Sequence, residues 1–402
     1  MSQERSAQQK AATYAELKAR GREAFASAAQ MPQSYVDAEI IPICYHPQDD
    51  WSYYGWPSIA RDSTGKLIIV CSGNRRYHVD PWGKVVIMYG NERDLTQWTK
   101  PRIIFNSPFD DRDAGILLLD DQTYLVSSFS LDIGKYAAGR SLEESLGLSA
   151  KDAAEAYAAI AKQPTELSSH YLGSWHTFSA DGGETWSEQI PSPLTTPHGP
   201  IRLRNGRLFY FGKLMFISDS GTKPEKPIMG AVSDNRGLSW RLLGPVPMPT
   251  GIIGENVHEP YAIELADGKM LGFIRLQMRK LDEPALRFTI MQTESTDGGL
   301  NWSEAKLLGC DGSPPHIIQH SSGTLVLVFG CRTAGRYGIR AWISEDDGQT
   351  WEREVILCED APSLDLGYPQ TVELADGSLF TIWYGQLNPG ERCSILGKNW
   401  RL

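Results

Sequence analysis

The sequence repeats one short motif, and this repetition constrains the fold more than any other feature. Residues 179–186 read Ser-Ala-Asp-Gly-Gly-Glu-Thr-Trp, and similar segments occupy residues 295–302, 344–351 and, with Asn235 in place of the aspartate, 233–240. The Asx side chain and the glycine favour a tight turn, and the tryptophan that follows can fold back over it. Copies at intervals of roughly 50 to 60 residues indicate a repeat architecture, in which each repeat is a small sheet that cannot bury its own faces alone.

A second repeat is a tight turn between two apolar strands, and the number of these turns indicates the number of sheets. Five of the turns contain a glycine and a sixth, at residues 119–125, does not; the glycines are Gly65, Gly206, Gly268, Gly323 and Gly377. A degenerate copy of the tryptophan motif at residues 91–98 follows the first turn. Six turns predict an all-β fold, a six-bladed β-propeller over residues 36–402, with the segment near residues 39–43 closing the ring as an outer strand.

Two segments have a helical pattern instead. Residues 7–29 contain good helix formers, so we expect a short helical N-terminal arm within residues 1–35. Residues 141–163 are rich in Ala, Glu and Leu with i, i+3, i+4 spacing, and Ser141 is a plausible N-cap. They predict a helical insertion on a loop, which either borders the functional face or only packs against the propeller.

Charge and cysteine usage exclude several classes of function. The formal net charge of -10 argues against a nucleic-acid partner or an anionic membrane. The six cysteines are scattered, so neither a zinc site nor a disulfide framework is predicted, and no phosphate-binding loop indicates an organic cofactor. The N-terminus has no apolar segment typical of a signal peptide, so a cytoplasmic location is expected.

The candidate functional residues come from equivalent places in the repeats. In a propeller the strand nearest the axis starts on the face that carries the pocket, so residues at the pocket-facing ends of the blades should converge. These positions are rich in arginine, histidine, tyrosine and carboxylates: Arg75, Arg76, His78, Arg112, Asp113, His198, His258, Glu259, Arg275, Arg332, Arg336 and Tyr368. Their convergence predicts a polar, positively charged pocket for an anionic sugar. Structural roles remain open for single members, such as a Glu259–Arg275 pair across a hairpin or Tyr368 in the core.

The tryptophan motifs resemble the Asp-boxes of the sialidase superfamily, from about residue 56 to the C-terminus. The resemblance implies that Tyr368 is a nucleophile, that Glu259 activates its phenol, and that Arg275 and Arg336 bind a substrate carboxylate. A phenol of pKa about 10 needs such a base to react at neutral pH, and guanidinium matches carboxylate bidentately. The resemblance also places Asp80 near the family's general acid/base, and His78 is an alternative proton donor.

The sequence departs from the family pattern at two positions. Gly55 stands where the first arginine of the family is expected, and Gly385 follows Tyr384 where a carboxylate is expected. Arg75, Arg76 or Arg112 could supply the missing charge from another backbone position.

Three functions are compatible with this pattern. The first is an exo-acting glycoside hydrolase that releases a terminal acidic sugar from an oligosaccharide or glycoside, without metal or organic cofactor. The second is a lyase acting on a uronate-containing saccharide, in which arginines neutralise the carboxylate and His78, His198 or His258 abstracts a proton. The third is a carbohydrate-binding propeller without catalysis.

Overall fold

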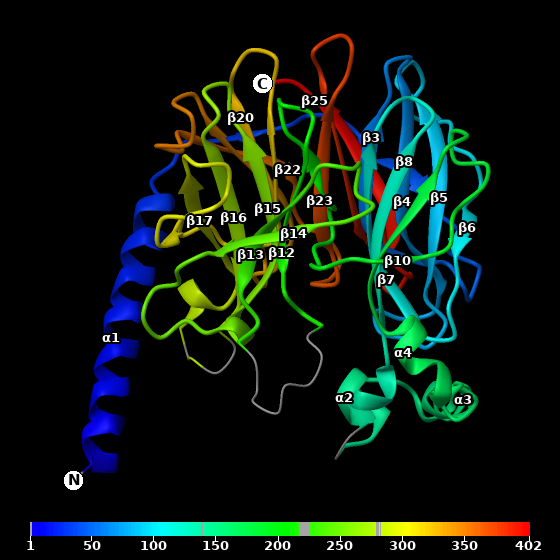
Figure 1. Ribbon diagram of the computed structural model, residues 1–402, viewed down its shortest axis with the longest axis horizontal. Coiled ribbons are helices and arrows are strands. Elements are labelled where there is room, and N and C mark those ends of the chain that lie inside the picture. Colours follow the sequence, from blue (N-terminus) through cyan, green and yellow to red (C-terminus); the bar gives the residue numbers. More distant parts are fainter. Residues whose placement is uncertain (1, 138–139, 217–224, 279–280, 282) are drawn as a thin grey trace.

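Six small sheets surround a central axis and form the body of the molecule (Figure 1). The computed structural model describes residues 2–137, 140–216, 225–278, 281 and 283–402. Within each blade, successive strands of the chain are neighbours and antiparallel, with the first strand nearest the axis. The arrangement confirms the predicted six-bladed β-propeller.

The strands of the first three blades are short, and their bounds follow in chain order. The first blade contains β3 (Tyr53–Arg61), β4 (Lys66–Arg75), β5 (Lys84–Asn91) and β6 (Arg102–Phe105). The second contains β7 (Asp110–Leu118), β8 (Tyr124–Leu131), β9 (Gly173–Ser179) and β10 (Ile190–Pro191). The third contains β11 (Ile201–Arg202), β12 (Leu208–Lys213), β13 (Ile228–Ser233) and β14 (Arg241–Pro245).

The last three blades have the same plan. The fourth contains β15 (Val257–Glu264), β16 (Met270–Leu276), β17 (Thr289–Ser295) and β18 (Lys306–Leu307). The fifth contains β19 (Pro315–Gln319), β20 (Leu325–Cys331), β21 (Gly338–Ser344) and β22 (Arg353–Cys358). The sixth contains β23 (Gly367–Glu373), β24 (Leu379–Gly385) and β25 (Ser394–Trp400).

The N-terminal segment closes the ring through two strands. β2 (Ile41–Cys44) pairs antiparallel with β25, so the expected closing strand is present in the sixth blade. β1 (Gln33–Tyr35) pairs parallel with β22 and adds a fifth strand to the fifth blade. The sequence did not predict β1, because three exposed residues carry no periodic pattern. The segment expected to be only an arm therefore also contributes to a sheet.

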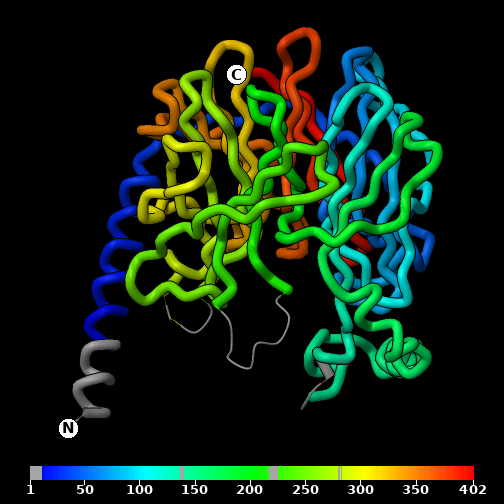
Figure 2. The backbone as a smooth tube through the Cα atoms, in the orientation of Figure 1, coloured from blue at the N-terminus to red at the C-terminus, as the bar shows by residue number. Residues whose placement is uncertain are grey.

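Helix α1 (Ser2–Ala28) lies along the outside of the fourth blade (Figure 2). Leu17 is buried in the same hydrophobic cluster as Leu286, and Arg22 forms an ion pair with Glu283 at 2.7 Å. Gly21 permits the close approach, because a Cβ there would lie 2.8 Å from Cδ2 of Leu286. The helix is thus a packing element, remote from the axis.

The helical insertion lies between β8 and β9, on the face opposite the glycine turns (Figure 1). Residues 141–163 contain two helices, which confirms the predicted helical insertion. Ser141 caps the first helix by accepting a bond from the Glu144 amide at 3.1 Å, and Gly147 ends it at φ +68°. The helical elements are η1 (Ile133–Ala137), α2 (Leu142–Leu146), α3 (Ala150–Ile160), η2 (Thr165–Leu167) and α4 (Ser168–Tyr171).

The Asp-boxes form turns with a common set of hydrogen bonds. In the first complete copy, the Gly183 amide donates to Ser179 Oγ at 2.8 Å and the Thr185 amide donates to Asp181 Oδ1 at 2.9 Å. The other three complete copies repeat both bonds at 2.8 to 3.0 Å. Each box is therefore a self-contained turn that its own side chains satisfy.

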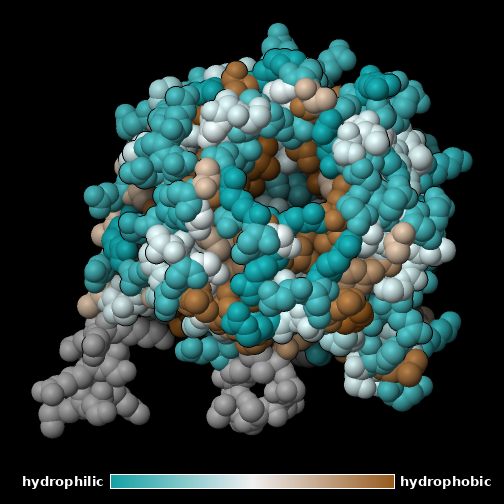
Figure 3. All heavy atoms as spheres, turned by 45° about the horizontal axis from the view of Figure 1, so that its top comes forward, coloured by the Kyte–Doolittle hydropathy of each residue, from teal (hydrophilic) through white to brown (hydrophobic). Residues whose placement is uncertain are grey.

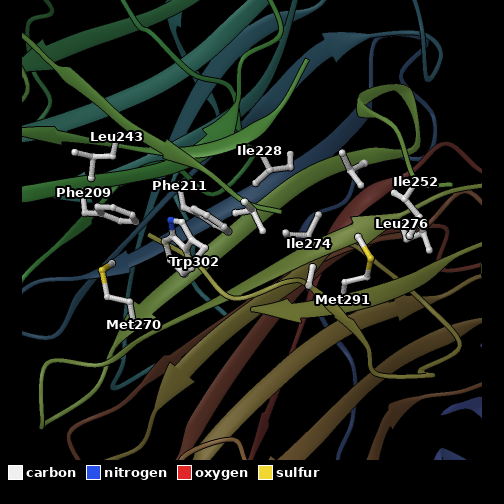
Figure 4. Packing of buried hydrophobic residues seen from close by; sticks show 14 of the residues in the cluster. Phe209, Phe211, Ile228, Leu243, Ile252, Met270, Ile274, Leu276, Met291 and Trp302 are labelled. Atoms are coloured by element: carbon white, nitrogen blue, oxygen red, sulfur yellow. The ribbon is translucent and has the colours of Figure 1, made fainter. Parts of the chain in front are cut away.

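The box tryptophans pack between adjacent blades. Trp302, the last residue of the fourth blade's box, lies against Phe211 of the third blade with ring centroids 4.7 Å apart (Figure 4). Trp351 contacts Phe273 of the fourth blade at 5.9 Å, and Trp98 stacks on Phe380 of the sixth blade at 6.2 Å. These contacts bury the faces that one blade cannot cover alone.

The face with the glycine turns is hollowed at the centre of the ring (Figure 3).

All six cysteines are free thiols. None of the helices in the described part of the chain combines the length and hydrophobicity that a membrane-spanning helix needs.

Candidate active site

Four innermost strands carry the same backbone distortion close to their first residues. The backbone φ is positive at Trp56 (55°), Asp113 (48°), Glu259 (46°) and Tyr368 (50°). The pairing register with the next strand shifts at each of these positions. Such bulges redirect a side chain, and positive φ in residues other than glycine is concentrated at functional sites. Here the distortion brings together side chains from the first, second, fourth and sixth blades.

Tyr368, Glu259 and Arg275 form the centre of the site. The Tyr368 hydroxyl donates to Glu259 Oε1 at 2.5 Å, and Arg275 Nη1 donates to the same hydroxyl at 3.2 Å and pairs with the Glu259 carboxylate. Burial favours a raised pKa for Glu259, but the charge of Arg275 outweighs it and lowers the pKa to about 2. Burial and the Glu259 charge raise the pKa of Tyr368 well above 10. The resting pair is a carboxylate bound to a protonated phenol.

Arg332 lies beside this centre and is fixed by the backbone. Its Nε and Nη2 donate to the Leu366 carbonyl at 2.9 and 2.7 Å, and its guanidinium lies 5.6 Å from the centre of the Tyr368 ring. Among the described residues, no carboxylate oxygen lies within 4.0 Å of the Arg332 guanidinium nitrogens. Arg332 is therefore a positioned positive charge that can accept an anionic ligand.

His78 enters the site from the loop after β4 and is held by a carboxylate. Its Nδ1 lies 2.8 Å from Asp365 Oδ1, and the Tyr53 hydroxyl donates to Asp365 Oδ2 at 2.9 Å. Nearly half of the His78 side chain, 47%, is open to solvent. The surrounding protein nevertheless lowers the His78 pKa below its ordinary 6.5, because desolvation outweighs the opposing effect of Asp365. The contact with Asp365 fixes the orientation of the His78 ring.

The site is a pocket of two adjoining chambers that share four residues: His78, Val79, Arg275 and Tyr368. The larger chamber, of about 410 Å³, extends towards Arg332 and Asp365. The smaller one, of about 300 Å³, extends towards Asp113 and Glu259. These volumes are typical of small-ligand pockets.

The smaller chamber contains further groups with shifted pKa values. Burial raises the pKa of Asp113 to about 7, against the effect of Arg112. Burial lowers the pKa of Lys213 to about 8, and Lys213 Nζ donates to the carbonyls of Gly254 and Val257 at 2.8 and 2.7 Å. His258 lies 3.2 Å from Lys213 Nζ, and burial and that neighbouring charge lower its pKa to about 4.

Asp80 and Arg75, which the sequence suggested as site residues, line neither chamber of the pocket. Asp80 is fully buried, and its carboxylate accepts the amides of Arg76 and Trp82 at 2.5 and 2.8 Å. Arg75 is also fully buried; it pairs with Asp110 at 3.0 Å and donates to the His78 carbonyl at 2.9 Å. Both side chains shape the loop that carries His78, because its backbone donors and acceptors need partners inside the fold.

Three other predicted binding residues are also placed away from the pocket. Arg76 pairs with Asp152 and Glu155 of α3 and so anchors the insertion. His198 is buried against His316 on the axis, with ring centroids 5.2 Å apart, and burial lowers its pKa to about 3. The resemblance to sialidases suggested that Arg336 binds the substrate carboxylate. Its side chain is 42% exposed and lies between Asp311 and Glu354. Arg332, which directly follows β20, lines the larger chamber, whereas Arg336 lines neither chamber.

Sequence reasoning missed Asp365 and Tyr53. Asp365 lies in an irregular segment before β23 and has no counterpart in the other repeats, so no pattern marks it. One signal for the bulges was available: Trp56, Glu259 and Tyr368 are each followed by proline. Among the residues that the structure describes, no cluster of His, Cys, Asp or Glu has a metal-binding arrangement.

The sequence profile of the BNR repeat-like domain matches residues 149–381, so the chain belongs to that family. Among solved structures it resembles a protein of unknown function from Dyadobacter fermentans, at 21% identity, with 90% of this chain and 98% of that one covered and a TM-score of 0.68. It also resembles a leech intramolecular trans-sialidase, at 15% identity, 91% and 70% coverage and a TM-score of 0.62. A third similar structure is the α-L-arabinanase of Penicillium chrysogenum, at 15% identity, with 90% of this chain and 98% of that one covered and a TM-score of 0.55. No curated protein matches the chain. The fold is that of the sialidase-like propellers.

Proposed function

We propose that the protein is an exo-acting glycoside hydrolase that releases a terminal acidic sugar. The observation that carries this proposal is the contact of the Tyr368 hydroxyl with Glu259 and Arg275, beside Arg332. Glycoside-hydrolase-type propellers among the structural relatives, a trans-sialidase and an arabinanase, support a saccharide as substrate.

The acidic character of the substrate follows from the cations of the larger chamber. Arg275 is already balanced by Glu259, whereas Arg332 has no carboxylate partner among the described residues. A sugar carboxylate bound beside Arg332 and Arg275 gains charge-assisted hydrogen bonds, and burial of Arg275 limits the screening of its charge by water. A neutral sugar leaves the Arg332 charge uncompensated.

The proposed reaction has two steps. In the first, the Tyr368 oxygen attacks the anomeric carbon and its proton passes to Glu259, while the glycosidic bond breaks and the leaving oxygen takes a proton from His78. In the second, water attacks the same carbon, His78 takes the proton of that water, and Glu259 returns its proton to the departing Tyr368 oxygen. Arg275 stabilises the negative charge that moves between Tyr368 and Glu259.

The pair of His78 and Asp365 favours a second candidate, a lyase acting on a uronate-containing saccharide. A lowered pKa keeps His78 neutral at pH 7, which suits a general base. In a lyase, His78 removes the proton next to the carboxylate, a carbon–carbon double bond forms, and the oxygen on the adjacent carbon leaves with a proton from Tyr368. Arg332 neutralises the carboxylate in this reaction as well.

Product analysis tests the proposal. The protein is incubated with a panel of sialosides and uronate-containing saccharides, and the products are analysed by mass and by ultraviolet absorbance. A saturated acidic sugar with one added water supports the hydrolase, and an ultraviolet-absorbing unsaturated uronate supports the lyase. Binding of one saccharide without any product contradicts both and identifies a carbohydrate-binding propeller.

A further inference from the structure

Tyr384 connects Arg332 to the pair of His78 and Asp365 in the larger chamber. Its hydroxyl accepts a bond from Arg332 Nη2 at 3.4 Å and donates to Asp365 Oδ1 at 3.2 Å. The same carboxylate oxygen lies 2.8 Å from Nδ1 of His78. One chain of hydrogen bonds therefore links the guanidinium to the imidazole through a hydroxyl and a carboxylate.

The Tyr384 ring is fixed in place, and its hydroxyl stays neutral. The residue lies on β24, is fully buried and packs beside Trp56 and Tyr368, with ring centroids 5.7 and 5.8 Å away. Burial and the nearby charge of Asp365 raise the pKa of Tyr384 well above its ordinary value of 10, so the hydroxyl keeps its proton. An uncharged, immobile group thus separates Arg332 from Asp365.

Gly55, which stands where the family's first arginine is expected, makes room for this arrangement. A Cβ at residue 55 would lie 3.2 Å from Cε1 of Tyr53 and 3.7 Å from Cδ2 of Tyr384. The Tyr53 hydroxyl donates to the second oxygen of Asp365 at 2.9 Å. An arginine at residue 55 would have to displace both rings from a packed environment. The departure from the family pattern therefore accompanies two tyrosines that hold Asp365.

The charged and titratable groups around the His78 ring act in opposite directions. Desolvation lowers the pKa of His78 most, Asp365 opposes this effect, and the positive charges of Arg112 and Arg332 lower the pKa further. Tyr53 lies 3.1 Å from Nδ1 and is uncharged, and the α2 residues that line the chamber do not titrate. Arg112 is paired with a carboxylate, whereas Arg332 has no such partner among the described residues. A bound anion can therefore compensate the charge of Arg332.

We infer that Tyr384 is a positioning residue: it keeps Arg332 apart from Asp365, so that an anion bound at Arg332 promotes the uptake of a proton by His78. Without the hydroxyl, an ion pair between Arg332 and Asp365 would remove both the anion site and the partner of His78. With the hydroxyl in place, the anion compensates Arg332, Asp365 keeps its charge, and the protonated imidazole is favoured.

The coupling gives the order of events in the proposed reaction, on which the inference rests. In the free protein at pH 7, His78 is neutral because its pKa lies below 6.5, and a neutral imidazole is not a general acid. Binding of the acidic sugar brings a proton from solvent to His78, which the leaving oxygen then receives. By reciprocity, protonation of His78 strengthens anion binding by the same factor.

The test follows His78 by NMR in protein with isotopically labelled histidine, and His78→Gln identifies its signals. The pH titration is recorded in sodium formate and in sodium chloride at equal ionic strength, because formate is a carboxylate that stays ionised where histidine titrates. Tyr384→Phe keeps the buried ring, and Arg332→Gln removes the cation. Tyr89→Phe is the matched control, since the Tyr89 hydroxyl contacts backbone carbonyls at residues 182–183 and lines neither chamber. Thermal unfolding verifies the fold of each variant.

Formate should raise the pKa of His78 in the wild type and in Tyr89→Phe, so that the ratio of protonated to neutral imidazole at a given pH rises about tenfold. Tyr384→Phe and Arg332→Gln should lose this response. A response that either variant retains overturns the inference, as does a wild type that shows none. The proposed function fails separately if the wild type cleaves no saccharide while formate still raises the pKa of His78.

Discussion

The two ends of the blades differ in what they repeat. At the outer turns, four Asp-boxes keep both the backbone and the side chains, with the same serine and Asx hydrogen bonds in each. At the pocket end, four inner strands keep only the bulge, and each presents a different side chain: Trp56, Asp113, Glu259 and Tyr368. Repetition of side chains therefore stabilises the ring, while divergence on a repeated backbone creates the asymmetric pocket.

Removing the central hydroxyl should have the largest effect on activity. Tyr368→Phe keeps the buried ring, which is 5% exposed, and removes the oxygen that contacts Glu259 and Arg275. We expect kcat to fall by about 1000-fold or more, as for other residues that act directly on the reacting atoms. The measurement is hydrolysis of an acidic aryl glycoside, with thermal unfolding to verify the fold. A variant that retains the wild-type rate contradicts the role of Tyr368 as the nucleophile.

Removing the positive charge of Arg332 should affect acidic substrates selectively. Arg332→Ala removes the cation beside Tyr368, and we expect kcat/KM for the acidic glycoside to fall about 10- to 100-fold, as for a lost charge-assisted hydrogen bond. Arg336→Ala is the matched control, because Arg336 lies outside the pocket. Equal losses in both variants contradict the assignment of the carboxylate site to Arg332.

The pH dependence separates the two proton-transfer roles of His78. Its pKa lies below 6.5, so a His78 that acts as general acid gives activity that declines as pH rises through that pKa, since only the protonated form donates. A His78 that acts as base in a lyase gives the opposite slope. Asp113, with a pKa of about 7, also titrates in this range. Profiles are therefore compared in the wild type, in His78→Gln and in Asp113→Asn.

We expect His78→Gln to lower kcat by about 100-fold. The variant should also lose the limb of the pH profile, meaning the change of activity with pH, that the titration of His78 causes. Asp113→Asn should retain that limb. If the limb disappears in Asp113→Asn instead, the proton-transfer group is Asp113 and the mechanism proposed for His78 is wrong.

Changes at the outer turns should affect stability and leave activity almost unchanged. Ser179→Ala removes the oxygen that accepts the Gly183 amide at 2.8 Å, at a site only 1% exposed. The free energy of unfolding should decrease by about 1 kcal/mol, as denaturant titration would measure, while kcat/KM stays within about twofold of wild type. A large loss of activity in a folded Ser179→Ala variant would mean that the boxes take part in the chemistry.

The sequence was sufficient for the fold because the blades repeat. The glycine turns and the Asp-boxes gave the blade count, and the segment near residues 39–43 was expected to close the ring, as β2 does. The site was predictable only where a residue lies on a strand of the repeat, as Glu259, Arg275 and Tyr368 do.

Residues on loops were harder to place. Asp80 and Arg75 share the dense polar loop with His78, and only the fold reveals that they satisfy its backbone while His78 faces the pocket. The choice between Arg332 and Arg336 depended on where the chain turns away after β20. Asp365 lies on a loop without any repeat, so sequence periodicity carries no information about it.

Covalent trapping can identify the residue that attacks the anomeric carbon. The protein is incubated with a fluorinated acidic glycosyl fluoride, which slows hydrolysis of a glycosyl-enzyme intermediate, and is then digested and analysed by mass spectrometry. The proposed role of Tyr368 as nucleophile predicts one added sugar on the peptide that contains Tyr368, and no adduct in Tyr368→Phe. An adduct on another residue, or turnover of the reagent without any adduct, would contradict it.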